Sequence, residues 1–516
     1  MATETHGLAA ADSSRSIVIR RAQDGAVLDE VPIHTGAEVS QMAAELRRAQ
    51  VEWEAIGPQG RKEWLGRLRD WMLDNQTRLT ELVVAESGKS WQDAALEVPT
   101  CIDVLNYYAG NAEKFLADRS VRPHNPAYFT KKLKVVYRPH QLVGVISPWN
   151  FPLVAPMIDI PAALAAGCAV LSKPSEVTPV AWREVVRGWR EDIGAPNVLA
   201  CATGLGETGA AVVDEVDMVQ FTGSTATGQK IAARCAERLI PHSLELGGKD
   251  PMIVLADADL ERAANGAVWG GFFNAGQVCV SLERVFVEAP VYDDFVDRVV
   301  AKTRALRQGP EHAPYESDVG ALTTDAQLEI VSRHVDEAIA AGAKALVGGR
   351  VKSGRYFEPT VLTDVDPAMS CMREETFGPT LPIMKVADAD EAVRLANDIP
   401  YGLSASVYSK NHERAEAIGR RLEVGTVNIN NSAINVFQLP VPMGGWKNSG
   451  AGNSRSGGAA GIQKFCRTQT ITADRIEPKA ELIWYPYTSF KGHLQARVLR
   501  LIGARDLRRR LGRSHS

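Results

Sequence analysis

The chain has 516 residues, which is more than one hydrophobic core usually holds, so we expect two or three domains. Apolar residues make up 45% and charged residues 23%, which is typical of a soluble globular protein, and the net charge of −4 favours no nucleic-acid partner. Seven scattered cysteines without a CxxC spacing argue against a zinc site or a disulfide framework. We expect a cytoplasmic protein without a bound metal.

The first half of the chain changes in character near residue 115. From Ala37 to Lys114 the apolar residues follow a helical spacing. Short β-rich runs then alternate with helical stretches. The strand candidates are Leu142–Ile146, Ala169–Ser172, Val198–Ala202, Met218–Thr222 and Ser243–Leu246. This alternation predicts an α/β fold with a parallel sheet, which binds nucleotides at the carboxyl ends of its strands.

A second alternation of strands and helices begins near Pro251 and ends near Gly445. Its strand candidates are Met252–Leu255, Glu283–Val287, Pro382–Val386, Ala405–Tyr408 and Gly425–Ile429. The glycine-rich segment Gly444–Gly461 is predicted as a loop. Two αβ halves of similar size predict two domains with a cleft between them.

Cys279 is the candidate nucleophile. It ends the segment Asn274-Ala-Gly-Gln-Val-Cys279. We expect it at the start of a helix, where the helix N-terminus would favour the thiolate. A lone cysteine is more often a buried structural residue, so the assignment depends on its neighbours.

Two polar residues are candidate partners of this thiol. Glu245, in Leu-Glu-Leu-Gly-Gly, ends a predicted strand and could act as a general base, although a strand-end ion pair is the commoner role. Asn150, in Pro-Trp-Asn-Phe-Pro, lies in a turn between two prolines. Its amide could donate to a developing oxyanion, but asparagine is also common in turns for purely structural reasons.

Two strand ends are candidate nucleotide-binding loops. Gly223 and Ser224 end one strand and begin a helix, where backbone N–H groups suit a phosphate. Lys173 and Glu176, in Lys-Pro-Ser-Glu, follow another strand and offer a charged pair to ribose hydroxyls. Neither loop has the GxGxxG pattern. Lys173 and Glu176 could also be solvent-exposed residues at the end of a strand, without a role in binding.

The order of these residues resembles the aldehyde dehydrogenase superfamily. The resemblance covers about residues 30–470, and the Leu-Glu-Leu-Gly-Gly and Gly-Gln-Val-Cys segments are its most specific motifs. It implies that Cys279 is the nucleophile, that Asn150 contributes to an oxyanion hole and that Glu245 activates the hydrolytic water. It also implies a set of cofactor contacts: Ser147, Trp149, Lys173, Glu176, Gly223, Ser224, Gly247, Glu375 and Phe377.

The resemblance implies a reaction and an architecture. The reaction is NAD(P)-dependent oxidation of an aldehyde to a carboxylic acid through a thioester, with NAD preferred over NADP. The expected fold has a Rossmann-type cofactor domain (16–120 and 140–246), a catalytic domain (247–446) and bridging strands (121–139 and 466–485) that build a homodimer or homotetramer. The alternatives are a succinate-semialdehyde dehydrogenase, a non-catalytic structural homologue and a cysteine-dependent ester hydrolase.

The resemblance also indicates the substrate tunnel. The positions implied are Phe151, Val154, Ile158, Phe273, Val278, Val280, Phe437 and Met443. The overall sequence is most similar to a bacterial subgroup labelled succinate-semialdehyde dehydrogenase, but Ile158 and Phe273 stand where those enzymes have arginines. An apolar tunnel favours an apolar or aromatic aldehyde over a dicarboxylate semialdehyde.

Residues 486–516 form a basic C-terminal extension. Residues 491–516 hold eight Lys or Arg and one acid, a charge of +7 that leaves the rest of the chain at −11 for the total of −4. Leu494, Val498, Leu501 and Ile502 would share one helical face. The pattern is typical of a helix that lies on an anionic membrane, or of a tail that docks on an acidic subunit.

Overall fold

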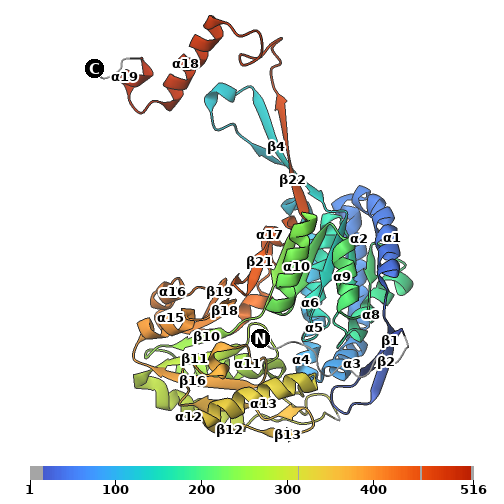
Figure 1. Ribbon diagram of the computed structural model, residues 1–516, viewed down its shortest axis with the longest axis vertical. Helices are drawn as coiled ribbons and strands as arrows, with labels where there is room; N and C mark the ends of the chain where they lie inside the picture. Colours follow the sequence, from blue (N-terminus) through green and yellow to red (C-terminus); the bar gives the residue numbers. More distant parts are fainter. Residues whose placement is uncertain (1–14, 312, 454–455, 513–516) are drawn as a thin grey trace. The chain divides into compact units, whose positions relative to one another are not determined.

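The computed structural model describes residues 15–311, 313–453 and 456–512. By its internal contacts the chain divides into two compact units (Figure 1). The first consists of Met1–Glu113 and Pro139–Phe465, and the second of Lys114–Arg138 and Cys466–Ser516. The first unit therefore contains both αβ halves.

The N-terminal part of the first unit begins with an antiparallel hairpin and continues as five helices. These elements are β1 (Ser16–Arg20), β2 (Val27–Pro32), α1 (Gly36–Ala55), α2 (Gly57–Asp74), α3 (Gln76–Ser87), α4 (Trp91–Ala95) and α5 (Glu97–Phe115). The Thr35 side chain caps α1, and Glu38 completes the capping box. The helices predicted between residues 37 and 114 are confirmed.

The first sheet has six strands in the order β21-β9-β8-β5-β6-β7, with only β21 antiparallel to its neighbour. The strands are β5 (Leu142–Ile146), β6 (Ala169–Lys173), β7 (Leu199–Cys201), β8 (Met218–Thr222), β9 (His242–Glu245) and β21 (Gly450–Gly452). The helices that connect them are α6 (Val154–Met157), α7 (Ile160–Ala166), α8 (Val180–Arg187), which continues into a π-turn, α9 (Gly206–Glu215) and α10 (Thr225–Arg238). The strand order reverses between β5 and β8, which is where open sheets of this kind bind ligands.

The second sheet has seven strands in the order β12-β15-β16-β11-β10-β18-β19. They are β10 (Asp250–Val254), β11 (Leu282–Glu288), β12 (Lys344–Val347), β15 (Thr360–Thr363), β16 (Thr380–Val386), β18 (Ser404–Tyr408) and β19 (Thr426–Ile429). Its helices are α11 (Leu260–Phe272), α12 (Tyr292–Arg304), α13 (Asp325–Ala340), α14 (Ser370–Arg373), α15 (Ala389–Asn397) and α16 (His412–Gly419). All neighbouring strands are parallel except β12 and β15.

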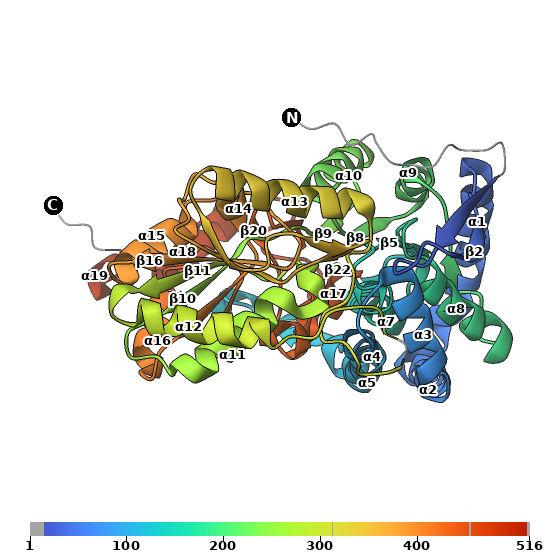
Figure 2. The ribbon, with the colours of Figure 1, turned by 90° about the horizontal axis from the view of Figure 1, so that it is seen from below.

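Helices cover both faces of this second sheet, so its central strands are buried throughout. Met252 and Val254 of β10 join a core with α11 and α12, which lie next to each other beneath the strands in Figure 2. Ile253, between them in sequence, points the opposite way and joins a core with α15 and α16. A strand that is buried on both faces has a continuous apolar sequence. For this reason the α/β fold class could be predicted from the sequence.

The second unit is a three-stranded antiparallel sheet with a helical extension. The strands are β3 (Arg119–Val121), β4 (Lys131–Pro139) and β22 (Cys466–Asp474), in the order β22-β4-β3. The extension contains α18 (Ser489–Gly503) and α19 (Leu507–Arg510), and neither helix buries a residue. Residues 513–516 of the predicted extension lie outside the described residues.

The structure corrects one prediction and adds short strands that the sequence did not reveal. The segment Gly444–Gly461 is not simply a loop: it contains β20 (Trp446–Lys447), β21 and the first residues of α17 (Gly458–Gln463). Its glycines do not prevent pairing, because Gly450 and Gly452 add an antiparallel edge to β9. Besides the first hairpin, the short pairs β13 (Val351–Ser353) with β14 (Tyr356–Phe357) and β17 (Tyr401–Gly402) with β20 were also not predicted.

Within the described ranges, no helix is long and apolar enough to cross a membrane, and no cluster of His, Cys, Asp or Glu could hold a metal ion. The cytoplasmic location stays a prediction.

Candidate active site

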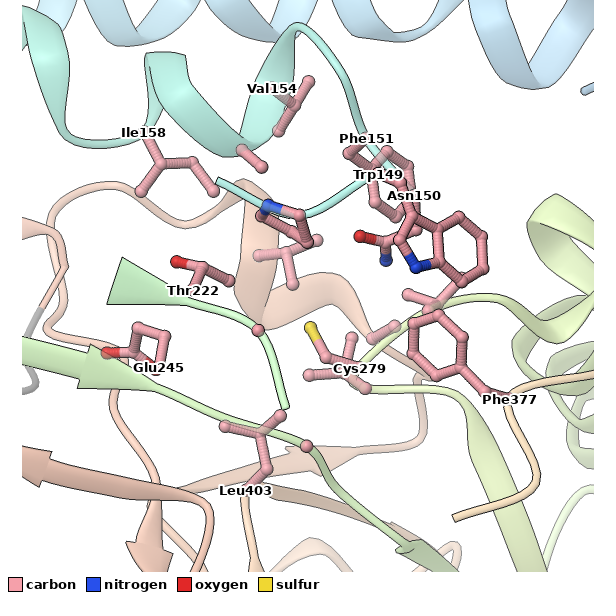
Figure 3. A pocket seen from close by; sticks show the side chains of 18 of the residues that line it. Trp149, Asn150, Phe151, Val154, Ile158, Thr222, Glu245, Cys279, Phe377 and Leu403 are labelled. Atoms are coloured by element: carbon pink, nitrogen blue, oxygen red, sulfur yellow. The ribbon is translucent and has the colours of Figure 1, made fainter. Parts of the chain in front are cut away.

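One cavity of about 400 Å³ in the first unit is lined by residues from both αβ halves (Figure 3). The Cys279 sulfur points into it, with Glu245 on one side and the rings of Trp149 and Phe377 on the other. Asn150 lies beside Trp149, and its amide contacts the loop that carries Cys279. The structure therefore brings the three candidate catalytic residues to one pocket.

The loop before Cys279 is a tight turn with left-handed backbone conformation. Asn274, Ala275 and Gly276 have φ angles of 51°, 53° and 73°. A Cβ on Gly276 would collide with the main-chain carbonyl of Gly378, so only glycine lets these two loops approach so closely. This is the physical reason for a glycine three residues before the cysteine.

Cys279 does not lie at the start of a helix, and that expectation was wrong. It follows the short 3₁₀ turn Phe273–Gly276 and leads through a further turn into β11. The β-branched residues after it complete a buried strand between β10 and β16, and this pairing prevents a helix from forming.

The surroundings of Cys279 hold its thiol in the protonated form. Burial raises the pKa of Cys279 to about 12, and the carboxylates of Asp250, Glu375 and Glu245 add to the effect. No helix N-terminus offsets them. In the cofactor-free protein the thiol therefore needs a base to become a nucleophile at neutral pH.

Glu245 is the last residue of β9 and is buried beside the cavity. Two glycines follow it. A Cβ on Gly248 would collide with the main-chain carbonyl of Cys279, so this glycine lets the loop after β9 lie against the cysteine. The Leu-Glu-Leu-Gly-Gly motif thus places a carboxylate and a close backbone contact at the same site.

Asn150 is fixed by the cysteine loop. Its side-chain amide donates to the carbonyl of Gln277 at 2.9 Å. The Asn274 side chain donates to the carbonyls of Asn150 and Gln277, both at 3.1 Å. These bonds join the two loops that flank the Cys279 sulfur.

Glu375 and Phe377 enter the cavity from the loop between α14 and β16. Glu375 accepts a hydrogen bond of 2.9 Å from the N–H of Gly248, and burial raises its pKa to about 8, with Glu283 adding to the shift. The Phe377 ring stands edge-on to Trp149, with 5.5 Å between the ring centres. The Trp149 and Phe377 rings form an apolar wall beside the sulfur, with the Glu375 carboxyl group also in the lining.

The remaining predicted cofactor residues lie at the carboxyl ends of the first sheet. Gly223 and Ser224 follow β8 and line the cavity, and Ser224 caps the 14-residue helix α10. Lys173 ends β6, and its ammonium lies 3.5 Å from the carboxylate of Glu176. Gly247 lines the cavity too, but Ser147, Lys173 and Glu176 are outside its lining.

This arrangement fits a nicotinamide dinucleotide. The N-terminus of α10 offers backbone donors suited to a pyrophosphate, next to the point where the strand order reverses. Glu176 offers a carboxylate to ribose hydroxyls at one end. The apolar wall of Trp149 and Phe377 suits a nicotinamide ring at the other.

All predicted tunnel residues line the cavity, namely Phe151, Val154, Ile158, Phe273, Val278, Val280, Phe437 and Met443. The lining also contains residues that the sequence analysis missed, among them Asp93, Leu96, Glu97, Thr100, Trp269 and Leu403. The rings of Phe151, Phe273 and Trp269 pack in a row, with centre-to-centre distances of 5.9 and 5.0 Å. Trp269 was detectable, because it precedes Phe273 by four residues, a spacing that brings two side chains together at the end of a predicted helix.

Comparison with known proteins places this geometry in one family. The sequence model of the aldehyde dehydrogenase family matches residues 9–471. The chain belongs to the aldehyde dehydrogenase family, as its motifs predict. Its members are oxidoreductases, and the predicted NAD(P) dependence agrees with the relatives described next.

Among similar curated proteins, one from Mycobacterium tuberculosis is provisionally named an NADP+ succinate-semialdehyde dehydrogenase; it is 40% identical over 88% of this chain and 87% of its own. The 4,4'-diapolycopene aldehyde oxidase of a Methylomonas species is 38% identical over 91% and 89%. Among solved structures, an NAD-dependent aldehyde dehydrogenase from Sinorhizobium meliloti has a TM-score of 0.85 and 33% identity over 92% and 93% of the two chains. A betaine aldehyde dehydrogenase variant from Staphylococcus aureus, in complex with NAD+, has a TM-score of 0.85 and 30% identity over 91% and 96%.

Proposed function

We propose that this aldehyde dehydrogenase oxidises apolar or aromatic aldehydes to carboxylic acids through a thioester on Cys279. The observation that carries the proposal is the position of the Cys279 sulfur. It points into an apolar cavity, between the Asn150 amide and the Glu245 carboxylate. A nucleophile, an oxyanion donor and a base therefore face the same space.

The chemistry assigned to these residues runs in two stages. Cys279 releases its proton to solvent water, and its sulfur forms a bond to the aldehyde carbon while the carbonyl oxygen becomes an oxyanion. The Asn150 amide and the Cys279 N–H donate to that oxyanion. The aldehydic C–H bond breaks and a thioester remains on the sulfur; NAD(P), when bound, takes up the hydride.

Hydrolysis completes the cycle. Glu245 takes a proton from a water molecule, whose oxygen attacks the thioester carbon. The carbon–sulfur bond breaks, the carboxylic acid leaves, and the proton held by Glu245 returns to the sulfur and restores the thiol. Splitting the reaction in this way replaces one difficult step by two easier ones.

The substrate assignment depends on the lining of the cavity. Among the described lining residues there is no Lys or Arg, and most of those near Phe151 and Phe273 are apolar. The lining also contains five acids, namely Asp93, Glu97, Asp159, Glu245 and Glu375, and Asp159 is ion-paired with Lys464. Glu97 is ion-paired with Lys89, and burial raises the pKa of Asp93 to about 7. A substrate carboxylate would lose hydration without gaining a cationic partner.

The test compares kcat/KM for benzaldehyde, hexanal and succinate semialdehyde, each with NAD and with NADP. We expect the two apolar aldehydes to exceed succinate semialdehyde by about tenfold or more, since each buried methylene contributes about 0.8 kcal/mol. A tenfold advantage of succinate semialdehyde would overturn the substrate assignment.

We further propose that the strands of the second unit assemble a homodimer or homotetramer. In β22, every residue after Cys466 is exposed, and the strand forms one edge of its sheet. An exposed edge of this length is a template for pairing with another chain. Light scattering of the purified protein measures the assembly, and a monomer at micromolar concentration would contradict it.

The basic extension is proposed to contact an anionic membrane. Phe490, Leu494, Leu501 and Ile502 are exposed on α18, with Val498 half-buried on the same side, and the helices carry Arg497, Arg500 and Arg508–Arg510. Exposed Trp484, Tyr485 and Tyr487 precede them, and such aromatic residues favour the membrane interface.

Co-sedimentation with phosphatidylglycerol vesicles tests this contact, with phosphatidylcholine vesicles as the neutral control. We expect binding to the anionic vesicles that is lost when Arg508, Arg509 and Arg510 are all changed to Gln. Equal binding to both lipids, or none, would contradict the proposal. A change of oligomeric state in the same variant would instead indicate docking on a neighbouring subunit.

A further inference from the structure

Two buried lysine–glutamate pairs hold two of the loops that line the cavity. Both lysine side chains are fully buried, and the glutamates are at most 3% exposed. In each pair the glutamate also accepts hydrogen bonds from two successive backbone N–H groups of a loop that lines the cavity. The catalytic roles proposed above assign no part to either pair.

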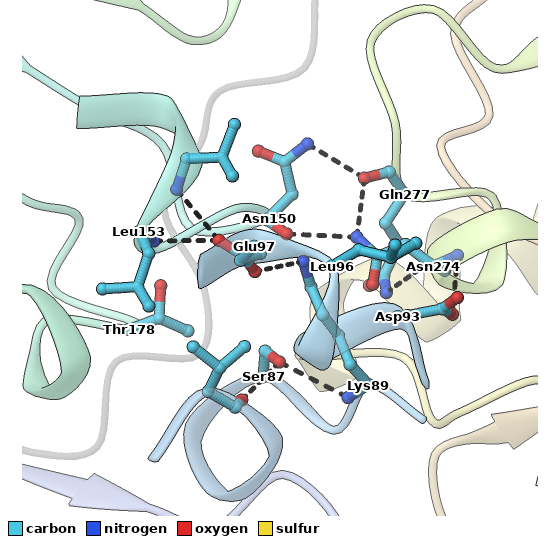
Figure 4. A network of polar contacts seen from close by, with 12 residues as sticks. Ser87, Lys89, Asp93, Leu96, Glu97, Asn150, Leu153, Thr178, Asn274 and Gln277 are labelled. Carbon is cyan, nitrogen blue, oxygen red and sulfur yellow. Dashed lines mark hydrogen bonds and ion pairs between the residues drawn. The ribbon is translucent and has the colours of Figure 1, made fainter. Parts of the chain in front are cut away.

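The first pair supports the loop that carries Asn150 (Figure 4). The Lys89 ammonium lies 2.6 Å from one oxygen of Glu97. The other oxygen of Glu97 accepts from the N–H groups of Leu153 at 2.9 Å and Val154 at 3.0 Å. The same ammonium lies over the Phe151 ring, 3.7 Å from its centre. The Lys89–Glu97 pair thus holds the loop that carries Asn150 and Phe151.

A neighbouring carboxyl group extends this support to the cysteine loop. Asp93, four residues before Glu97, accepts a hydrogen bond of 3.0 Å from the N–H of Asn274. Asn274 in turn donates to the carbonyls of Asn150 and Gln277. One short segment, Lys89–Glu97, therefore contacts both loops that face the sulfur.

The second pair supports the loop that carries Glu375 and Phe377. The Lys249 ammonium lies 2.5 Å from one oxygen of Glu283. That oxygen accepts from the N–H of Thr376 at 2.7 Å, and the other accepts from Phe377 at 2.9 Å. Lys249 also donates to the Thr376 hydroxyl at 3.1 Å.

These contacts explain how charged side chains can be buried at these two positions. A buried carboxylate is costly unless a cation and hydrogen-bond donors satisfy it, and here each one has both. A carboxylate that accepts two successive N–H groups fixes the direction of the loop, which an apolar side chain cannot do. Burial lowers the pKa of Lys89, so its charge depends on Glu97.

We propose that the two pairs are separate positioning devices: Lys89–Glu97 sets Asn150 against Cys279, and Lys249–Glu283 sets Glu375 and Phe377 for the cofactor. The proposal rests on the function proposed above. Neither glutamate touches the reacting atoms, so each acts through the loop that it holds. Their effects should therefore appear in different measured quantities.

The test compares Glu97→Gln and Glu283→Gln with the control Glu288→Gln. Glu288 is also buried and accepts a backbone N–H, that of Ala256, but it does not line the cavity. We expect Glu97→Gln to lower kcat by about 10- to 100-fold, since small misplacements at a reacting centre have effects of that size, with the Kd of NAD unchanged. We expect Glu283→Gln to weaken NAD binding by about tenfold, measured by calorimetry.

A double-mutant cycle separates positioning from general destabilisation. In an Asn150→Ala background, Glu97→Gln should lower kcat by less than about threefold, because the group it positions is gone. A merely structural effect would keep its full size in that background and would overturn the assignment of Glu97. Glu97→Asp, which retains the charge but shortens the side chain, provides a second variant if Glu97→Gln does not fold.

The Lys249–Glu283 pair is tested separately, by the Kd of NAD. Equal Kd values for NAD in the wild type and a folded Glu283→Gln would overturn the assignment of Glu283. This measurement needs no turnover, so it remains valid if the protein oxidises none of the aldehydes tested. Failure of the proposed function would appear in the wild-type enzyme, whereas failure of this inference would appear only in the variants.

Discussion

The Asn150 side-chain amide donates a 2.9 Å hydrogen bond to the main-chain carbonyl of Gln277. Gln277 lies two residues before Cys279, so the bond fixes the amide close to the nucleophile. A donor held in advance needs no reorganisation when charge develops on a substrate oxygen, and preorganisation of this kind makes oxyanion stabilisation effective.

Asn150→Ala should therefore lower kcat by about 10²- to 10³-fold, which is the usual effect of removing one oxyanion donor. NAD binding should stay within about twofold of the wild type. Steady-state kinetics and calorimetry measure the two quantities. Retention of more than a tenth of the wild-type kcat would show that Asn150 is not an oxyanion donor.

The second prediction concerns the reactivity of Cys279 in the cofactor-free enzyme. Because its pKa is raised to about 12, the thiolate is scarce at neutral pH, and alkylation by iodoacetamide should accelerate about tenfold per pH unit from pH 7 to 10. The labelled residue is identified by mass spectrometry, with Cys279→Ala as the control. A rate that is level across this range would contradict the raised pKa.

Glu245→Gln tests the role of this carboxylate in the second stage. Without the base, thioester hydrolysis should slow by about 10²-fold or more, while a rapid single-turnover burst of reduced cofactor survives. Stopped-flow absorbance at the reduced-nicotinamide band measures both phases. Loss of the burst together with steady-state turnover would show that Glu245 acts mainly before the thioester forms.

Ten of the thirteen strands described in the two sheets could be predicted, because each of these ten is a short apolar run bounded by turns, whereas β12, β15 and β21 were not predicted. The ten strand candidates all correspond to observed strands, with ends that differ by at most two residues. The edge pairings were not predictable. β21 is glycine-rich, and only its contact with β9 makes it a strand. The turn that contains Cys279 was misread, since the pairing of β11 with distant strands decides its structure.

The site residues were recognisable where a motif carries them, as with Asn150, Glu245 and Cys279. The residues behind them were not. Lys89 and Glu97 lie in a helical stretch where charged residues usually face water, and no local pattern indicates that this pair is buried. Their role depends on the approach of a loop more than fifty residues away in sequence.

Cofactor preference is the fourth prediction. The partly exposed Glu176 carboxylate would accept hydrogen bonds from ribose hydroxyls and repel a 2′-phosphate, while Lys173 reduces that repulsion. NAD should therefore exceed NADP in kcat/KM by about tenfold, and Glu176→Ala should narrow the gap. The exposed Glu191, changed to Ala, is the matched control. Equal use of both cofactors by the wild type would refute the preference.

The last prediction reverses the selectivity of the tunnel with one charge. Ile158 lines the cavity, where the described lining has no cation. In Ile158→Arg, a guanidinium would meet the carboxylate of succinate semialdehyde. Two charges 4 Å apart attract by about 4 kcal/mol near a protein surface, and desolvation offsets part of this. The ratio of kcat/KM for succinate semialdehyde to that for hexanal should then rise by about tenfold or more over the wild type.

Ile158→Met, which is similar in size and uncharged, should leave the ratio within about threefold, and raising the salt concentration should reduce the gain of the arginine variant. If Ile158→Arg folds, binds NAD and shows an unchanged ratio, the side chain at position 158 does not reach the substrate, and the tunnel assignment at that position is wrong.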